Sequence, residues 1–406
     1  MIKSFSLGAA LLFTTLVNVE SKPYFVVFGD ETSDIGNNET YVFGFPTWHS
    51  RPSSGPMWNE YLAHYNNYTL INFALPGSVS NLTNLLANEP KGDQYVNSAT
   101  QFQNYGSVFG NRLNKTAIQS DIAVIQLGFN DLYMSNLPFN SKSVDTNFVN
   151  SISSSLLMHA DIAYSFGYRN LVVTDIQSID KMPIAQKYNA QDVENFKNHV
   201  DALNEKLRSG VSSYISSKKS ELKSFKIFSL NDFYNAATSQ DVIKALNLTS
   251  STDSCYPVAS TAVFKQACID SDKIAYYGGT TLNTKLHALL GAAFAETLAS
   301  SDFAINGTSL VSIIKKYNVT GAGAAVNFMY NKDSVKTGKL DVDEYNFAAA
   351  KNNSASLITT KNNDISTDGT DGKVTVNTSQ QSSAIYSANL SGSAFALLCL
   401  LVAASF

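Results

Sequence analysis

A polar loop that follows the first apolar run of the chain contains the residue types best suited to chemistry. Residues 28–37 place Asp30, Glu31 and Asp34 close to the hydroxyl of Ser33. A pair of carboxylates can hydrolyse a glycosidic bond, and a serine hydroxyl can attack an ester when a base takes its proton. A third interpretation is structural, because Asp30 and Asp34 can hold the loop by hydrogen bonds.

Five short β-branched or aromatic runs predict the strands that must position this loop. Helical spacing of apolar residues separates the runs, and this alternation is typical of a parallel sheet covered on both faces. We therefore predict an α/β fold of three layers, α/β/α, around a five-stranded parallel sheet. The loops that follow Phe28, Ala74 and Gly128 should meet at the carboxyl rim, where such sheets bind ligands. The predicted strands are Tyr24–Phe28, Leu70–Ala74, Ile122–Leu127, Asn170–Thr174 and Phe225–Ser229, and the predicted helices are Met57–His64, Thr146–Phe166, Gln191–Ser217, Gln240–Leu246 and Lys285–Leu298.

Five motifs along the chain resemble blocks of the GDSL (SGNH) hydrolase family. Residues 28–37 are similar to its Phe-Gly-Asp-Ser-x-Ser-Asp-x-Gly-Asn block, and residues 51–63 look like its R-x-S-N-G-x-x-W-x-x-Y-L-A stretch. Residues 72–78 resemble N-[YF]-A-x-x-G-A, residues 128–131 match G-x-N-D, and residues 277–287 align with W-D-x-x-H-P-T-x-x-x-H. Each block is weak alone, but their order is specific. The resemblance implies a flavodoxin-like sheet and hydrolysis of acyl esters, in the style of secreted fungal acetylesterases and lecithinase-like members.

The chain departs from this family at each catalytic position. Glu31 stands where the family has its nucleophilic serine. His287 sets the register of the last block, which puts Gly278 at the aspartate position and Thr281 at the histidine position. None of these side chains can form an acyl-serine or act as its base near neutral pH. The resemblance therefore predicts a lost catalytic triad.

Other residues of the family pattern are kept. Gly77 and Asn130 are the expected contributors to an oxyanion hole, beside the backbone N–H of Glu31. Both also have a structural interpretation, because a turn can require glycine and an amide can tie two loops together. The residues expected to have structural roles in the loops are Asp30, Ser33, Asp34, Asp131 and His287.

Three functions stay open from the residues. The first is a pseudoenzyme that keeps a pocket for an acylated glycan or lipid, with Glu31 at its floor. The second is an active carboxylic-ester or acetyl-ester hydrolase with a rewired centre that uses Ser33 or a relocated base. The third is a structural cell-wall glycoprotein. We expect no cofactor, and the few cysteines and scattered histidines predict no metal site.

Composition narrows the class of protein. The chain has 406 residues, of which 11% are aromatic, too many for a wholly disordered protein. A net charge of −4 shows no basic excess, which argues against binding to nucleic acid. Only 15% of residues are charged, against about 25% in a typical soluble protein, and this fits a secreted surface. We expect a monomer.

Both ends of the chain resemble processing signals. Lys3 and the apolar run Leu7–Val17 predict a signal peptide, and a buried first element is the alternative. Small residues at 382–384, a polar spacer and the apolar end 394–406 predict a glycosylphosphatidylinositol anchor attached at Ser382, whereas a packed apolar helix is the alternative. The protein should then lie at the outer face of the plasma membrane or in the cell wall. The predicted divisions are a signal peptide (1–21), a hydrolase-like domain (22–300), an appended segment (301–350), a Ser/Thr/Asn-rich stalk (351–382) and a removed anchor signal (383–406).

Cysteines and glycosylation sequons agree with secretion. Cys399 would leave with the anchor signal, so Cys255 and Cys268 stay as an even pair that predicts a disulfide in an oxidising compartment. Sequons for N-glycosylation occur along the whole chain. They are at Asn38, Asn67, Asn81, Asn114, Asn247, Asn306, Asn318, Asn352, Asn377 and Asn389.

Overall fold

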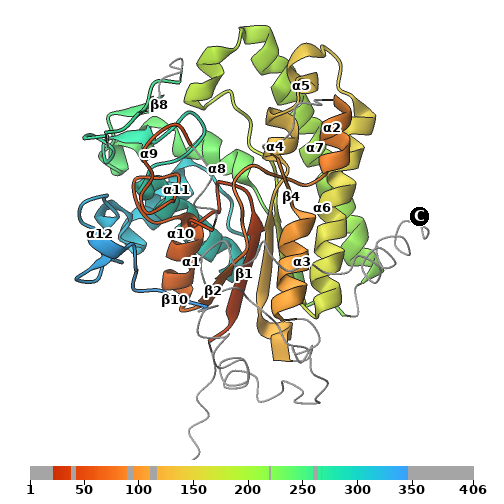
Figure 1. Cartoon of the computed structure of the whole chain (residues 1–406), viewed down its shortest axis with the longest axis horizontal. Coiled ribbons are helices and arrows are strands. Elements are labelled where there is room, and N and C mark those ends of the chain that lie inside the picture. The colour runs from red at the N-terminus through yellow and green to blue at the C-terminus, as the bar shows by residue number, and fades with distance from the viewer. Residues whose placement is uncertain are drawn as a thin grey trace, which may run out of the picture.

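Six parallel strands form the central sheet of the protein, in the order β10-β2-β1-β5-β6-β7. The computed structural model describes residues 22–37, 43–88, 95–109, 117–218, 221–258, 264–266 and 268–345. Helices cover both faces of the sheet (Figure 1). The strands of the sheet are β1 (Tyr24–Gly29), β2 (Thr69–Asn72), β5 (Ile122–Gln126), β6 (Asn170–Thr174), β7 (Ser224–Phe228) and β10 (Asp343–Glu344).

Two small sheets and a set of helices complete the described fold. Strands β3 (Ser78–Val79) and β4 (Val96–Asn97) pair with each other, as do β8 (Ser250–Ser254) and β9 (Ile274–Tyr276). The helices are α1 (Trp58–Asn66), α2 (Leu82–Asn88), α3 (Ala99–Val108), α4 (Phe129–Tyr133), α5 (Leu137–Asn140), α6 (Thr146–Phe166), α7 (Ala190–Ser217), α8 (Leu230–Ala237), α9 (Gln240–Ala245), α10 (Thr284–Ala299), α11 (Gly307–Lys316) and α12 (Ser334–Thr337).

Strand β1 is buried along its whole length because helices pack on both of its faces. On one face, the ring of Phe25 lies 6.0 Å from that of Trp58 in α1, and Trp58 stacks on Phe294 of α10 at 4.2 Å. On the other face, Phe28 stacks on Phe102 of α3 at 4.1 Å. The continuous apolar run of β1 therefore follows from its position in the centre of a covered parallel sheet.

The long helices begin and end at residues that suit those positions. The side chain of Asp145 accepts a hydrogen bond from the third amide of α6, and Gly167 ends this helix at a φ of +116° that glycine tolerates best. Asn189 and Asn283 cap the amino ends of α7 and α10 in the same way. The caps therefore fix the ends of helices whose positions the apolar periodicity predicted.

The sheet has one strand more than the five predicted. Five strands form at the predicted positions, and β10 adds to the free edge of β2, where Asp343 pairs with Thr69 and the amide of Tyr345 donates to the carbonyl of Leu70. Strand β10 consists of two exposed acidic residues. It carries no apolar alternation that a sequence reading could detect.

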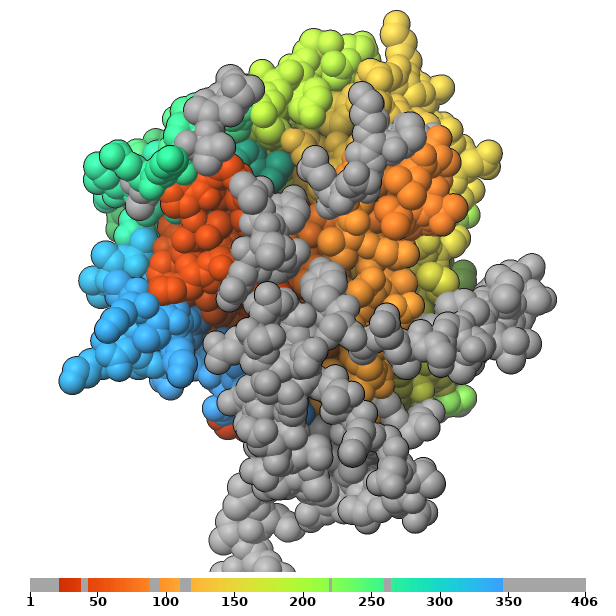
Figure 2. Space-filling model, viewed as in Figure 1, coloured from red at the N-terminus to blue at the C-terminus, as the bar shows by residue number. Residues whose placement is uncertain are grey.

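The segment after α10 packs on the amino-terminal part of the chain. Trp48 stacks on Tyr330 with ring centroids 5.5 Å apart, and the amide of Asn327 donates to the hydroxyl of Tyr61 at 2.6 Å. The two segments lie side by side on the surface, where red meets blue in Figure 2. Residues 319–345 thus belong to the same packed unit as the central sheet.

Several predictions concern residues outside the described parts of the chain. The signal peptide, the whole stalk segment with Ser382, and the anchor signal lie outside them, as do the sequons at Asn38, Asn114, Asn352, Asn377 and Asn389. No helix in the described ranges is both long and apolar enough to cross a membrane.

A buried ion pair holds the loop before α1. The Nε atom of Arg51 donates to both carboxylate oxygens of Glu60, at 3.0 and 2.9 Å, and the Glu60 side chain is fully buried. Glu60 also accepts from the amide of Met57 at 2.8 Å, and the Arg51 guanidinium lies over the ring of Trp48. These contacts fix the entry of the chain into α1.

Replacing one partner of this pair should destabilise the fold strongly. We expect Arg51→Met to lower the free energy of unfolding by about 3–5 kcal/mol, because Glu60 would stay buried without a counter-charge. The double variant Arg51→Met/Glu60→Gln should recover part of this loss, since glutamine is neutral and keeps an acceptor for Met57. Urea unfolding followed by circular dichroism measures both, and a loss below about 1 kcal/mol in the single variant would contradict the prediction.

Candidate functional site

Three polar loops meet at the carboxyl ends of β1, β2 and β5. Across the sheet the five long strands stand in the order β2-β1-β5-β6-β7, which is 2-1-3-4-5 when these five are numbered along the chain. The direction of winding therefore reverses between β1 and β5. Crevices at such a reversal are the usual ligand sites of open α/β sheets. The loop with Glu31 follows β1, and Asn130 follows β5, so both lie at this reversal.

The carboxylate of Glu31 lies between the two residues that the sequence predicted as contributors to an oxyanion hole. Its Oε2 atom accepts from the amide of Gly77 at 3.1 Å and from the Nδ2 atom of Asn130 at 2.8 Å. Donors at these distances from one anionic oxygen have the geometry of an oxyanion hole. No hydrogen bond from a described residue reaches Oε1. One carboxylate oxygen of Glu31 therefore accepts from both residues.

Hydrogen bonds to Asp131, a residue of the motif at 128–131, hold the two donors in place. Asp131 accepts from the amide and hydroxyl of Ser80, at 2.8 and 2.9 Å, and from the amide of Asn81 at 2.9 Å. These bonds tie the loop of Gly77 to the start of α4, which carries Asn130. Gly77 itself adopts a φ of +74°, which explains why glycine stands there.

Ser33 lies in the core and has structural partners. Its hydroxyl donates to the side chain of Gln126 at 2.7 Å and accepts from the indole of Trp58 at 3.0 Å. It is fully buried, and its carbonyl accepts from the amides of Asn59 and Asn72. A nucleophile needs access to a substrate and a base at its hydroxyl, and Ser33 has neither in this arrangement.

The aspartate and histidine positions of the last motif form a closed turn. The amide of Gly278 donates to the hydroxyl of Thr281 at 2.8 Å, and the amide of Tyr277 donates to the Thr281 carbonyl at 2.8 Å. The ring of Phe45 lies over this turn, and a Cβ atom on Gly278 would stand 2.8 Å from it. No described hydrogen bond joins Gly278 or Thr281 to Glu31. The structure thus brings Glu31, Gly77 and Asn130 together and gives the other two positions a different environment.

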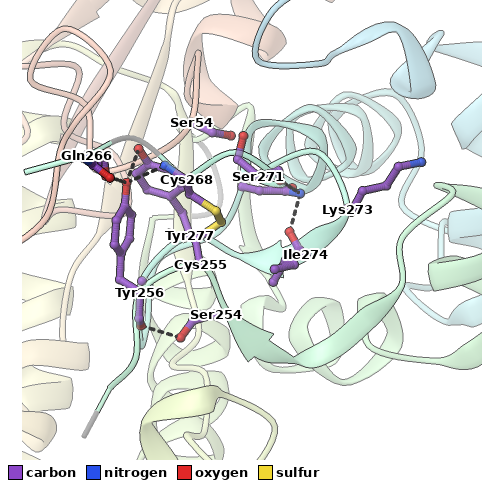
Figure 3. Close-up of a disulfide and its surroundings, with 12 residues drawn as sticks. Ser54, Ser254, Cys255, Tyr256, Gln266, Cys268, Ser271, Lys273, Ile274 and Tyr277 are labelled. Carbon is purple, nitrogen blue, oxygen red and sulfur yellow. Dashed lines mark hydrogen bonds between the residues drawn. A yellow bond between two sulfur atoms is a disulfide. The ribbon is translucent and has the colours of Figure 1, made fainter. Parts of the chain in front are cut away.

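The predicted disulfide is present and supports that turn. Cys255 and Cys268 are bonded, and the amide of Cys255 donates to the carbonyl of Tyr276 at 3.0 Å. Figure 3 shows the bond beside Tyr256 and Tyr277; the hydroxyl of Tyr256 accepts from the amide of Cys268 at 3.0 Å. Phe45 stacks on Tyr256 and meets Tyr277 edge to face. Sequence reasoning missed Phe45, because its contact to the turn crosses more than two hundred residues of chain without a periodic pattern.

The histidines do not supply a base to this site. His287 is buried in α10, neither ring nitrogen has a partner among the described residues, and burial lowers its pKa to about 3. His159 stacks on Phe102, and burial lowers its pKa to about 4. The rings of His49 and His64 contact the carbonyls of Val335 and Asp341 instead. No group of three metal-ligating side chains occurs in the described ranges.

The carboxyls next to Glu31 have unusual proton affinities. Burial, together with the charge of Glu31, raises the pKa of Asp30 well above its ordinary value. Burial raises the pKa of Asp34 to about 7, although the amides of Asn37 and Gly36 partly offset this. Both groups are fully buried, so the loop after β1 holds protonated carboxyls at mildly acidic pH.

Comparisons with known proteins give no family. No protein-family model matches the chain, and no curated protein matches it. Among solved structures, LAE5, an alpha/beta hydrolase enzyme from the metagenome of Lake Arreo in Spain, is 13% identical, with a TM-score of 0.28 over 48% of this chain and 75% of that one. Another solved structure is 14% identical, with a TM-score of 0.33 over 57% of this chain and 88% of that one. Such low TM-scores carry no weight for function.

Asp34 should make the protein more stable as the pH falls from about 7 to about 4. In this window the folded state holds a proton on Asp34, whereas the unfolded chain, with an ordinary pKa of 3.8, releases it. This contribution is fully present below pH 3.8 and is lost as the pH rises through about 7, with a slope of up to about 1.4 kcal/mol per pH unit. Urea unfolding of the wild type and of Asp34→Asn across this range measures it.

Asparagine at position 34 keeps the acceptor that the Asn37 amide uses, so the variant should fold. His159 and His287 act with the opposite sign, because their lowered pKa values favour proton binding by the unfolded chain. Both histidines are present in the wild type and in Asp34→Asn, so their contributions cancel when the two unfolding free energies are subtracted. Parallel curves of stability against pH for the two proteins would show that Asp34 is ionised in the folded state.

Proposed function

We propose that this protein is a non-catalytic member of the GDSL (SGNH) hydrolase family, which binds an acylated glycan or lipid at its carboxyl rim and does not cleave it. The observation that carries this proposal is the Glu31 carboxylate between Gly77 and Asn130. An ester carbonyl would need the same two donors to stabilise its oxyanion. Support also comes from the strand order 2-1-3-4-5, which flavodoxin-like sheets share, and from the ordered sequence motifs.

Binding at this rim would use the part of Glu31 that the protein leaves accessible. Glu31 is half-buried, and Oε1 accepts no hydrogen bond from a described residue. A carboxylate oxygen in that position accepts hydrogen bonds from sugar or glycerol hydroxyls. We therefore assign Glu31 a double role, in which Oε2 fixes the loop and Oε1 faces the ligand.

An active ester hydrolase with a rewired centre finds no support in the site. Ser33, the proposed replacement nucleophile, is fully buried and bonded to Gln126 and Trp58. A structural cell-wall glycoprotein without a ligand is the other alternative. Glycan or lipid binding separates it from the proposal: the wild type should bind and Glu31→Gln should not, because the glutamine oxygen can keep Gly77 and Asn130 while its NH₂ group replaces the outward acceptor.

Restoring catalysis should require more than the three triad residues. We expect the wild type to hydrolyse p-nitrophenyl acetate no faster than an unrelated secreted glycoprotein. The triple variant Glu31→Ser/Gly278→Asp/Thr281→His should stay inactive, because a side chain at position 278 meets Phe45 at 2.8 Å. Adding Phe45→Ala should release this contact and raise the rate by about 10²–10⁴-fold, the usual contribution of a positioned general base.

The control for this series is Glu31→Ser alone, which empties the anion site and supplies a hydroxyl without a base. It should show only the small residual rate that an oxyanion hole provides. Fast turnover by the wild type that disappears in Ser33→Ala would refute the proposal and establish the rewired hydrolase.

We also propose that the protein enters the secretory pathway and is held at the cell surface by a lipid anchor. The described sequons at Asn67, Asn247, Asn306 and Asn318 are exposed at helix ends. Glycopeptide mass spectrometry of the full chain should find glycans at these four. Asn81 should be unmodified, because it is half-buried and its amide donates to both Ser151 and Ser155, at 2.9 and 3.1 Å, whereas Asn306 is exposed.

Release by a phosphatidylinositol-specific phospholipase tests the anchor. The wild-type chain expressed in a eukaryotic host should leave the membrane fraction on treatment. A chain truncated after Gln381 should be secreted without treatment. A full-length chain that carries no glycans and stays inside the cell would contradict both proposals.

A further inference from the structure

One buried side chain of α3 holds the two loops that carry Glu31 and Gly77. The Oε1 atom of Gln101 accepts from the amide of Gly29 at 2.9 Å, and its Nε2 atom donates to the carbonyl of Gly29 at 2.8 Å. The same Nε2 atom donates to the hydroxyl of Ser78 at 2.8 Å, and both of these side chains are fully buried. Gly29 ends β1 just before Glu31, and Ser78 directly follows Gly77. A single amide group therefore connects the two segments whose contact forms the candidate site.

Gln101 replaces a strand partner at the point where β2 stops. Strand β2 ends at Asn72, which pairs with Val27 of β1. Beyond that pair the amide of Leu75 donates to the carbonyl of Gly29 at 3.0 Å, whereas the amide of Gly29 has its acceptor in the Gln101 side chain. Buried backbone amides need such a partner, because an unpaired one destabilises the fold. The side chain of α3 thus extends the pairing of β1 to the start of the loop that follows it.

The bonds at Gln101 require both an acceptor and donors on one side chain. The hydroxyl of Ser78 donates to the carbonyl of Leu75 at 2.7 Å, so it meets Gln101 as an acceptor. The carbonyl of Gly29 is an acceptor as well. A glutamate would keep the acceptor for the Gly29 amide and would place an oxygen against these two acceptors, and a methionine would supply neither.

We propose that Gln101 is a positioning residue of the rim, which fixes the loop of Glu31 against the loop of Gly77. The amide of Gly77 donates to the Glu31 carboxylate at 3.1 Å, across 46 positions of the chain. This length is at the long end of the usual range for such bonds, so a small displacement of either loop weakens it. The effect on Glu31 follows from the contacts of Gln101, whereas any effect on ligand binding rests on the proposed function.

Two variants of the full chain remove the donors of Gln101 in different ways. Gln101→Glu keeps the shape of the side chain and its acceptor, and Gln101→Met keeps only its length. Each should lower the folding equilibrium constant about tenfold or more, because buried groups lose their partners. In NMR spectra of the folded variants, the amide proton of Gly77 should move upfield at least about half as far as it does in Glu31→Ala, which removes its acceptor.

Asn204 of α7 offers a matched control on the other half of the sheet. Its Oδ1 atom accepts from the amide of Ile176 at 2.8 Å, its Nδ2 atom donates to the carbonyl of Ile176 at 2.7 Å, and its side chain is buried. Asn204→Asp should therefore lower stability as Gln101→Glu does and leave the Gly77 resonance in place. A Gly77 resonance that keeps its wild-type position in the Gln101 variants would overturn the proposal, because Gln101 would then only stabilise the fold. An equal displacement in Asn204→Asp would overturn it too.

A binding measurement separates this proposal from the proposed function. The probe is an acetylated xylo-oligosaccharide, which presents acyl groups and free hydroxyls together. Gln101→Met should bind it at least about tenfold more weakly than the wild type, because the site loses its preorganisation. Asn204→Asp should stay within about twofold of the wild type. Equal binding by Gln101→Met and the wild type would overturn the link between Gln101 and the ligand. A wild type that does not bind would contradict the proposed function for acylated glycans, and the Gly77 resonance alone would then decide the role of Gln101.

Discussion

The contact between the Glu31 carboxylate and the donors of Gly77 and Asn130 is the constraint that organises the rim of this protein. It joins the loops after β1 and β5 across the point where the sheet changes its direction of winding. One acceptor oxygen accepts from both donors, and the Nδ2 atom of Asn130 also donates to the carbonyl of Ser78 at 3.2 Å. The network behind them, from Asp131 to Ser80 and Asn81, holds the same loops in the absence of any ligand. The hydrogen bonds of the Glu31 side chain therefore connect the loops that surround it.

Local pattern was sufficient for the main elements and insufficient for those formed by tertiary contacts. The apolar runs of β1, β5 and β6 predicted their strands because both faces are covered, which makes the whole run apolar. Strand β10 consists of Asp343 and Glu344 and pairs with β2 through backbone atoms alone, so its side chains carry no signal. The pairing of Cys255 with Cys268 was predictable by counting once Cys399 was assigned to the predicted anchor signal.

The candidate site likewise has features that the sequence predicts and features that only tertiary packing determines. Motif order brought Glu31, Gly77 and Asn130 to one rim, because parallel strands place their following loops at the same edge. The side-chain rotation that puts Glu31 between the two donors could not be read from the sequence, and neither could the cover of Phe45 on Gly278. Both depend on packing between segments distant in the chain.

Under the proposed function, the arrangement also explains how the rim can stay ordered after catalysis is lost. Without this acceptor, the amide of Gly77 would lose its partner and the Nδ2 atom of Asn130 would keep only the carbonyl of Ser78. Glu31 supplies this acceptor from within the chain, because its side chain carries a carboxylate oxygen to both donors. The shorter side chain of serine carries a hydroxyl, which is a weaker acceptor than an anionic oxygen. Once Glu31 holds the loops, Gly278 and Thr281 are free to form a closed turn under Phe45. In this view the oxyanion donors are kept because the fold uses them, and the rim stays ordered without turnover.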